Sequence, residues 1–226
     1  MSDLNEIQMQ IIKELTFKPS YKFSDIKPYK ITSDKFSYHL KALQDLNLII
    51  KSDSGEYSLS TEGKKFATTI DMEVKKVEKL PKNSVLLIVK RDDKFAIQRR
   101  MKEPYIGFLG FITGKIKFGE TLIEAANREL EEECQIKANF KYQYTFHELT
   151  YQKSDNLLLE DKYFYCMVGA FVSGDLSNTE GAENVWMSIE DFRKAEPKYH
   201  NEIEILELYL DNFEKLFEKK YFIEKF

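Results

Sequence analysis

The sequence is poor in cysteine and has no long hydrophobic run. Its two cysteines among 226 residues, Cys134 and Cys166, are too few for a disulfide framework and do not form a CxxC pair. This cysteine content fits a reducing compartment, so we expect a cytoplasmic protein. No apolar stretch approaches the ~20 residues of a membrane-spanning helix, and the polar N-terminus does not resemble a signal peptide. We therefore expect no membrane partner.

The sequence also lacks a strong charge of one sign. Its net charge of −4 at pH 7 gives no general attraction for nucleic acid. Hydrophobic residues make up 42% of the chain and aromatic residues 14%, which favours folded cores over disorder. A chain of this length forms one large domain or two small ones, and its hydrophobic periodicity favours two. We expect a domain over residues 1–72, a charged linker over 73–83 and a second domain over 84–226.

The first domain is predicted to begin with two helices. Asp3 with Glu6 is a candidate cap for the first helix, and Pro19 ends it. A short second helix is predicted over residues 23–29. Apolar residues recur with a period near 3.6 along the first helix, which indicates one buried face.

A third helix and a hairpin are predicted to follow. Thr32 or Ser33 caps the helix, and Asn47 suits a left-handed stop at its end. Residues 48–52 and 56–60 predict two strands, because the polar turn Asp53-Ser54-Gly55 separates them. The residues of this helix that are expected to face the core are Phe36, Leu40, Leu43 and Leu46.

Three helices followed by a hairpin is winged-helix order, and the segments 36–43, 48–50 and 57–63 resemble winged helix-turn-helix transcription factors. The resemblance implies that the third helix enters the major groove of double-stranded DNA while the hairpin touches the backbone. The candidate DNA-binding residues are Lys35, Ser37, Tyr38, His39 and Lys41 on the helix and Lys51 on the hairpin.

Two alternatives stay open for this domain. Its lysines and acids are nearly equal in number, so it lacks the basic footprint of a DNA-binding protein, and a protein partner is the other reading. His39 is either a groove-facing residue or an ordinary packing residue of the helix.

Residues 114–136 carry the acidic pattern that points to chemistry. Thr121 and Glu124 form a capping box, which predicts a helix from Leu122 to about Cys134. Glu129, Glu132 and Glu133, at positions i, i+3 and i+4, share one face of that helix. Like charges this close repel unless a cation lies among them. Carboxylate oxygens are hard ligands, so a divalent ion such as Mg²⁺ or Mn²⁺ is the simplest partner, and a solvated acidic face is the alternative.

The full spacing resembles the Nudix box of the Nudix hydrolase superfamily. That pattern reads Gly, five residues, Glu, seven residues, Arg-Glu, an aliphatic residue, any residue, Glu-Glu, any residue, Gly, and an aliphatic residue. Two positions depart from the family, since Gln135 replaces the glycine that ends the helix and Thr113 replaces the first of two glycines. The matching residues are Gly114, Glu120, Arg128, Glu129, Leu130, Glu132, Glu133 and Ile136.

The resemblance implies an α/β/α sandwich with a mixed sheet and a metal-dependent hydrolase site. Glu129, Glu132 and Glu133, with a backbone carbonyl of Thr113 or Gly114, would bind Mg²⁺ or Mn²⁺. Arg128 would orient a carboxylate, either Glu129 or Glu120. Relatives often place a further acid near the late strand, where Glu180 and Glu183 are the two candidates.

The loop after the first hairpin of this domain offers candidate substrate contacts. Arg99 and Arg100 either meet a phosphate or pair with surface acids. Tyr105 and Phe108 either stack on a base or pack within the fold.

The remaining elements complete an alternating α/β pattern. Strands are predicted over residues 85–89, 95–98, 140–146, 163–171 and 185–187, with a short helix after the last one. A final amphipathic helix over residues 201–219 is expected to cover the sheet or to seal a homodimer.

Two functions remain open from the sequence. The resemblance implies a hydrolase that cleaves the pyrophosphate of a nucleoside diphosphate linked to another group, with possible coupling to DNA-binding regulation. The alternative is a transcriptional regulator whose Nudix domain senses an ADP-ribose-like nucleotide without turnover.

Overall fold

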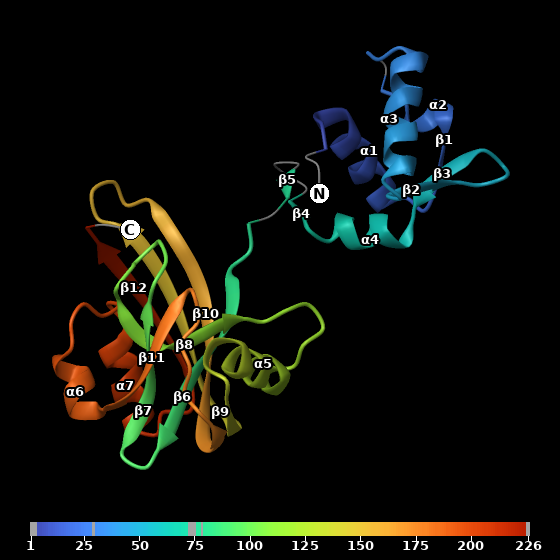
Figure 1. Cartoon of the computed structure of the whole chain (residues 1–226). Coiled ribbons are helices and arrows are strands. Elements are labelled where there is room, and N and C mark those ends of the chain that lie inside the picture. Colours follow the sequence, from blue (N-terminus) through green and yellow to red (C-terminus); the bar gives the residue numbers. More distant parts are fainter. Residues whose placement is uncertain (1–3, 29, 72–75, 78, 225–226) are drawn as a thin grey trace. The chain divides into compact units, whose positions relative to one another are not determined.

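A computed structural model of the chain describes residues 4–28, 30–71, 76–77 and 79–224. The chain forms two compact units, Met1–Lys79 and Leu80–Phe226, called here the N-terminal and C-terminal units (Figure 1). In the described part of the chain, no helix is both long and apolar enough to cross a membrane.

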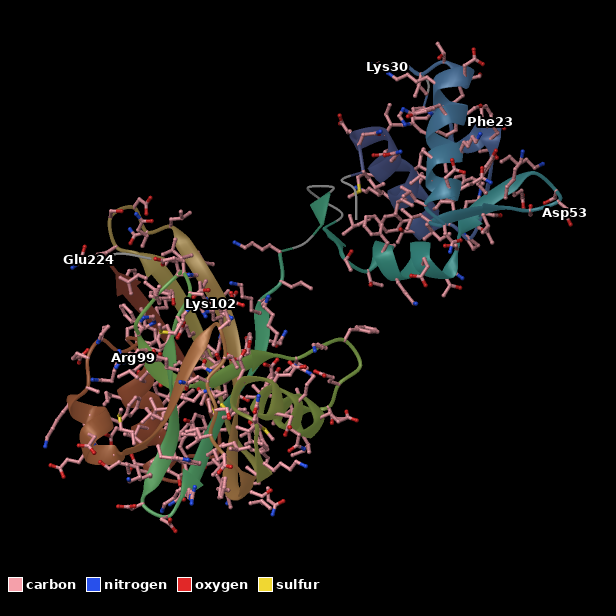
Figure 2. The ribbon with its side chains drawn as sticks, viewed as in Figure 1. Phe23, Lys30, Asp53, Arg99, Lys102 and Glu224 are labelled. Atoms are coloured by element: carbon pink, nitrogen blue, oxygen red, sulfur yellow. The ribbon has the colours of Figure 1, made fainter. Side chains whose placement is uncertain are left out.

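In the part that the structure describes, the N-terminal unit contains four helices and short strands. A three-stranded sheet has the order β1-β3-β2, and β4 pairs with β5. Figure 2 shows Asp53 at the tip of the β2–β3 hairpin. The elements are α1 (Glu6–Phe17), β1 (Tyr21–Lys22), α2 (Phe23–Ile26), α3 (Ser33–Asp45), β2 (Ile49–Lys51), β3 (Glu56–Leu59), α4 (Thr61–Ala67), β4 (Ile70–Asp71) and β5 (Lys76–Val77).

The cap of α1 differs from the prediction. Asn5 is the N-cap, and its side chain accepts from the backbone N–H of Ile7 and Gln8 in a capping box. Asn is as good a cap as Asp, and here it has the Gln partner three residues later. The predicted cap Asp3 lies outside the described residues, as does Tyr29 at the predicted end of α2.

The predictions for α3 are confirmed except at its end. Thr32 caps the helix with its side chain, and Asn47 has a left-handed φ of 55°. Phe36, Leu40 and Leu43 are buried against α1 and the hairpin. Leu46 is 45% exposed, so its predicted place in the core is wrong. It is the C-cap residue, where the helical periodicity no longer applies.

His39 is a packing residue of α3. Its side chain is buried, with Nδ1 3.4 Å from the Asn5 Nδ2 atom and the ring edge-on to Tyr38. The prediction that His39 faces a DNA groove is therefore wrong. The other candidates, Lys35, Ser37, Tyr38, Lys41 and Lys51, are exposed. The winged helix-turn-helix assignment itself stays a prediction.

Helix α4 is an additional element after the hairpin. Ser60 caps it by accepting from the Gly63 N–H at 2.9 Å. Gly63 lies against the hairpin, where a Cβ atom would be 1.8 Å from the Leu48 carbonyl oxygen. A glycine inside a short helix weakens its sequence signal, because glycine has low helix propensity.

The C-terminal unit is built on a seven-stranded mixed sheet. Its order is β11-β7-β8-β6-β10-β9-β12, with parallel pairing of β10 with β6 and of β12 with β9. The elements are β6 (Lys82–Arg91), β7 (Lys94–Arg100), β8 (Leu109–Lys115), α5 (Leu122–Cys134), β9 (Ile136–Gln152), β10 (Leu158–Gly174), β11 (Ala182–Ser188), α6 (Ile189–Lys194), α7 (Glu202–Leu210) and β12 (Leu216–Ile223).

Helices cover both faces of this sheet, as Figure 1 shows for α5 on one side and for α6 and α7 on the other. Strand β6 alternates between the two cores. Val85, Leu87 and Val89 pack in the cluster that contains α5, whereas Leu86 and Ile88 pack in the cluster under α6 and α7. A central strand that is buried on both faces reads as a continuous apolar run. The predicted α/β/α sandwich with a mixed sheet is confirmed.

The predicted helix over residues 201–219 is wrong in its second half. Helix α7 ends at Leu210, Asn212 has a left-handed φ of 50°, and the chain continues as β12. Phe217 and Tyr221 of β12 stack on Phe146. A spacing of four residues, as between Phe217 and Tyr221, places two side chains on one side of a helix and also on one face of a strand. Residue spacing alone therefore does not distinguish a helix from a strand in this segment. Buried Ile205 and Leu206 show that α7 does cover the sheet.

His147 joins β12 to the sheet. Its ring is stacked on Tyr163 at 3.9 Å, its Nδ1 is 2.7 Å from a Glu218 oxygen, and its Nε2 is 3.0 Å from an Asp161 oxygen. Burial lowers the pKa of His147, but the hydrogen bonds with the two carboxylates outweigh burial and raise the pKa above its ordinary value.

Replacing His147 with Gln should remove a pH-dependent contribution to stability. Because the folded-state pKa is raised, this contribution is fully present below the unfolded pKa of about 6.5 and is lost as the pH rises through the folded value. The loss of unfolding free energy in His147→Gln should therefore be larger at about pH 5.5 than at about pH 8.5. Urea denaturation, monitored through the fluorescence of Trp186, the chain's single tryptophan, measures the free energy of unfolding at each pH. Equal losses at both pH values, or the same trend in the exposed control Lys141→Gln, would contradict the assignment.

Candidate active site

The candidate site begins in the loop between β8 and α5. The Thr121 side chain accepts from the Glu124 N–H at 3.3 Å, and the Thr121 N–H donates to Glu124 at 2.8 Å, so the predicted capping box is present. Helix α5 has the predicted bounds. Gln135 follows it with a left-handed φ of 58°, a conformation that costs a non-glycine residue about 1 kcal/mol. Gln135 thus ends the helix in the left-handed conformation that glycine adopts most readily.

Glu129 lies against Gly114 of β8. A Cβ atom on Gly114 would be 1.8 Å from the carboxyl carbon of Glu129, so only glycine allows this approach. The Glu129 side chain is mostly buried, and burial raises its pKa while the hydrogen bond from Arg128 lowers it. The net shift is upward. Glu129 is therefore held against the backbone of β8, and its carboxylate binds a proton more readily than an exposed glutamate does.

Arg128 holds the acidic residues of the site together. Its guanidinium donates to Glu120 at 2.5 and 2.8 Å, to Glu129 at 2.7 Å and to Glu132 at 3.0 Å. Its fourth partner is the Lys115 carbonyl oxygen, at 2.9 Å. The hydrogen bond from Arg128 and a second one from the Lys117 N–H lower the pKa of Glu120 to about 2. Glu120 therefore stays ionised and fixes the guanidinium.

Glu132 and Glu133, the other two predicted metal ligands on α5, contact different partners. Glu132 is half-exposed and contacts Lys117 at 3.5 Å in addition to Arg128. Glu133 accepts from the Gln98 Nε2 atom at 3.2 Å. Gln98 also donates to Asn184, whose Nδ2 atom donates to the Glu133 carbonyl oxygen at 2.6 Å. Strands β7 and β11 thereby position the end of α5 that carries Glu133.

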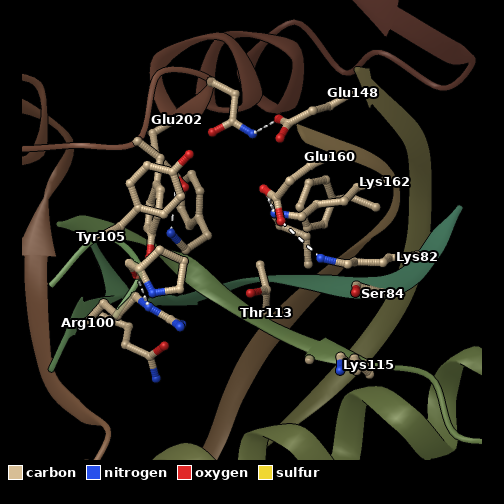
Figure 3. A pocket seen from close by; sticks show the side chains of 18 of the residues that line it. Lys82, Ser84, Arg100, Tyr105, Thr113, Lys115, Glu148, Glu160, Lys162 and Glu202 are labelled. Carbon is tan, nitrogen blue, oxygen red and sulfur yellow. Dashed lines mark hydrogen bonds and ion pairs between the residues drawn. The ribbon is translucent and has the colours of Figure 1, made fainter. Parts of the chain in front are cut away.

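A cavity of about 510 Å³ opens beside these residues. Thr113, Gly114 and Glu133 line it at the α5 end. Figure 3 shows Arg100 and Tyr105 on one side of the cavity and Glu148, Glu160, Lys162 and Lys82 on the other. Its volume is typical of small-molecule sites.

Residues 80–209 match the family model for the NUDIX domain, which covers more than half of the chain. The chain belongs to this family. Its C-terminal unit is therefore a Nudix domain, and the cavity and the acidic helix lie within it.

Solved structures of Nudix proteins have the same fold. A NUDIX hydrolase from Nitrosomonas europaea is 20% identical with a TM-score of 0.51, covering 60% of this chain and 93% of that chain. The MutT protein from Bacillus halodurans is 16% identical with a TM-score of 0.52, covering 62% and 88%. The NUDIX domain of Shewanella oneidensis NrtR, complexed with ADP ribose, is 15% identical with a TM-score of 0.50, covering 66% and 96%. A comparison with curated proteins gives no match.

Arg99 and Arg100, at the end of β7, brace the loop that follows this strand. Arg99 donates to the Gly107 carbonyl oxygen at 2.8 Å and lies 3.9 Å from Glu183 (Figure 2). Arg100 donates to the carbonyl oxygens of Lys102 and Pro104, at 2.8 and 2.5 Å. Of the two, Arg100 lines the cavity. These contacts fix the loop that forms one wall of the cavity.

Tyr105 and Phe108 belong to an aromatic cluster in the same loop. Tyr105 has a left-handed φ of 68°, and its ring centroid lies 5.4 Å from those of Phe108 and Tyr199. Tyr105 lines the cavity with Tyr199, whereas Phe108 packs behind them. An aromatic ring at the cavity surface offers a face on which a planar ligand can stack.

The two candidate late acids lie on the β11 side of the domain. Glu183 contacts Arg99, and strand alternation puts it on the face opposite Asn184, which contacts the Glu133 carbonyl. Glu180 is exposed in the turn before β11. Within the described residues, no hydrogen bond or ion pair joins either acid to the carboxylates of α5.

The donor chemistry of the motif suits a divalent cation. Glu129, Glu132 and Glu133 offer hard oxygen ligands, and the Gly114 contact brings Glu129 to the strand carbonyls. In the described ranges no three acidic, histidine or cysteine side chains are arranged as a metal cluster. Arg128 and Gln98 occupy oxygens of these carboxylates, so a cation has to compete with those hydrogen bonds. The residue types fit Mg²⁺ or Mn²⁺.

Several cavity residues have no sequence motif. Glu148 and Thr150 continue the buried face of β9 after Tyr144 and Phe146, so polar residues at core positions were the available signal. Glu160 of β10 pairs with Lys82 of β6 at 3.1 Å and with Lys162 on its own strand, which joins two segments that are distant in the sequence. The residues without a motif are Lys82, Glu148, Glu160, Lys162, Asn201 and Glu202.

Glu202 is a buried acid at the start of α7. Its Oε2 atom accepts from the Phe111 N–H at 3.0 Å, and the side chain lines the cavity. Burial raises the pKa of Glu202 to about 8, with the Phe111 N–H acting in the opposite direction and the charge of Glu148 adding to the rise. Glu202 is therefore largely protonated at neutral pH.

Replacing Glu202 with Gln should stabilise the fold by an amount that grows with pH. In the unfolded chain Glu202 ionises above about pH 4.3, whereas in the folded protein it keeps its proton up to its raised pKa. Between these two pKa values, Glu202 lowers the free energy of unfolding by up to ~1.4 kcal/mol for each pH unit. The amide keeps the oxygen that accepts from Phe111. We expect the advantage of Glu202→Gln over the wild type to increase by at least ~1 kcal/mol between about pH 5 and 7.5 in urea titrations. A pH-independent difference, or the same increase in the exposed control Glu214→Gln, would show that Glu202 is not protonated in the fold.

Proposed function

We propose that this protein is a metal-dependent hydrolase that cleaves the pyrophosphate of a nucleoside diphosphate linked to another group. The observation that carries the proposal is Glu129 seated against Gly114 and joined through Arg128 to Glu120 and Glu132. Burying charged groups costs stability unless they are compensated. Concentrating four carboxylates of one motif beside a cavity is consistent with a site that binds a cationic ligand.

In this proposal, Glu129, Glu132, Glu133 and a carbonyl of Thr113 or Gly114 hold Mg²⁺ or Mn²⁺. The bound ion neutralises charge on the pyrophosphate oxygens and makes water a better nucleophile. Arg128 fixes Glu129 in place, and Glu129 is the candidate either to ligate the ion or to accept a proton from the attacking water. Glu180 or Glu183 is the candidate for a further acid.

The proposed substrate lies in the cavity with its phosphates toward α5. Arg100, at the cavity wall, and Arg99, behind it, are the candidate phosphate contacts, and Tyr105 with Phe108 forms the candidate base platform. The nucleotide is a small-molecule partner in the cytoplasm. No particular substrate is assigned by these residues.

Glu132→Gln and Glu133→Gln should each lower turnover by about 100-fold or more with folding intact, because each removes a charge that holds the cation. A panel of nucleoside diphosphate derivatives with Mg²⁺ or Mn²⁺, scored by phosphate release with and without a phosphatase, measures turnover. Chelation of the metal should abolish it and re-addition restore it.

The matched control is Glu131→Gln, which makes the same change on the exposed face of the same helix. Its turnover should stay near that of the wild type. Near-normal hydrolysis by Glu132→Gln and Glu133→Gln would overturn the proposed roles of both residues.

A second candidate function is a transcriptional regulator that senses a nucleotide. It is favoured by the fold similarity to the NrtR domain, which was solved with ADP ribose, and by the order of helices and hairpin in the N-terminal unit. In this alternative, residues 1–72 bind double-stranded DNA through Lys35, Ser37, Tyr38 and Lys41 of α3 and Lys51 of the hairpin. Residues 84–226 bind an ADP-ribose-like effector with or without hydrolysis, and the protein acts as a homodimer.

If the regulator reading holds, Lys41→Ala should weaken DNA binding about equally across sequences and lower the salt slope of log K by about one. Gel shifts or fluorescence anisotropy at several salt concentrations measure both quantities. Lys94→Ala, which removes an exposed charge from the C-terminal unit, is the control and should change neither. Absence of DNA binding by the wild type at low salt would eliminate this candidate.

A further inference from the structure

Asn201 places a hydrogen-bond acceptor without a partner in the cavity of the Nudix domain. The residue immediately precedes α7, is 5% exposed and lines the cavity. Among the described residues, its Oδ1 atom is buried without a hydrogen-bond partner. Nearly all buried polar atoms are paired, so an unpaired acceptor that lines a cavity indicates a ligand that supplies the missing donor.

The orientation of the Asn201 amide is fixed by Glu148. The Nδ2 atom donates to the Glu148 Oε2 atom at 2.5 Å. Glu148 also accepts from the Thr150 hydroxyl at 3.0 Å and lies 3.6 Å from the His200 Nε2 atom. Although burial raises the pKa of Glu148, the contacts with His200 and other groups lower it overall, so the carboxylate is ionised and only accepts. A flipped amide would place its oxygen against the Glu148 carboxylate, so that two acceptors face each other. The amide is therefore not flipped, and Oδ1 remains available to accept from a donor.

Another part of the cavity wall is aromatic. Tyr105 lines this wall, and its ring is held by Tyr199 and Phe108. In Figure 3 Tyr105 lies across the cavity from Glu160 and Lys162. A ligand group that matches both walls is planar and carries an N–H donor at its edge.

We propose that Asn201 determines substrate specificity by accepting a hydrogen bond from the exocyclic amino group of a nucleobase. The inference rests on the proposed function, which puts a nucleotide in this cavity, and it deepens that function by naming the class of base. The preferred substrates are amino-bearing nucleotides, because a base without the amino group leaves the buried acceptor unpaired.

The test measures binding without turnover. Dissociation constants of the full-length protein are determined by calorimetry in the presence of a chelator for two pairs of 5′-monophosphates. Adenosine is compared with purine riboside, and guanosine with inosine, since the members of each pair differ in an exocyclic amino group. At least one amino-bearing nucleotide should bind ten-fold or more tightly than its partner. Ribose 5-phosphate should bind more weakly than either.

The variant Asn201→Leu removes the acceptor and should reduce the discrimination to less than about two-fold. Asn139→Leu is the matched control, because it makes the same change at an exposed position of β9, and it should keep the wild-type discrimination. If Asn201→Leu fails to fold, the wild-type ratios alone decide. The inference is overturned if neither pair is discriminated, if no nucleotide binds, or if the discrimination survives in Asn201→Leu.

Failure of the inference is distinguishable from failure of the proposed function. Discrimination in binding without hydrolysis of any nucleotide would support the role of Asn201 and remove the hydrolase. Hydrolysis with equal affinity for both members of each pair would keep the hydrolase and remove the role of Asn201.

Discussion

The guanidinium of Arg128 is the positive charge around which the acidic site is organised. It contacts three carboxylates and one backbone carbonyl, so the loop before α5 and the helix itself share one hydrogen-bonding centre. Without that charge, the acids would repel one another at the edge of a folded sheet. The same guanidinium also competes with any cation for the carboxylate oxygens. One side chain therefore determines both how the carboxylates are placed and how easily a cation can reach their oxygens.

Local patterns made much of this site predictable. The capping box and the bounds of α5 follow from neighbouring residues, since a helix start is determined by contacts within a few positions. The left-handed residue after α5 was implied only by the family pattern, which has glycine where this chain has Gln135. The close approach of Glu129 to Gly114 was implied only by resemblance to a family pattern. Its physical reason, the absence of a Cβ atom on Gly114, needs the structure.

The cavity could not be derived in the same way. Glu148, Glu160, Asn201 and Glu202 come from three segments that periodicity describes only as strands or a helix. Their convergence depends on the order of strands in the sheet, which neighbouring residues do not encode. The wrong assignment of β12 had a similar cause, because its place in the sheet depends on pairing with β9 and on the stacking of Phe217 and Tyr221 on Phe146, which are contacts between distant segments. His39 shows the reverse, where a polar residue type suggested a surface and the fold placed it in the core.

Strand β12 also bears on where the Nudix domain ends. The family match stops at residue 209, yet the sheet continues through Ile223, and Phe146 is covered by two rings of that last strand. A fragment cut to the family boundary would leave β9 as a bare sheet edge and uncover part of the core, which invites aggregation. The smallest piece of this chain that can be expected to fold as a soluble Nudix domain therefore includes β12.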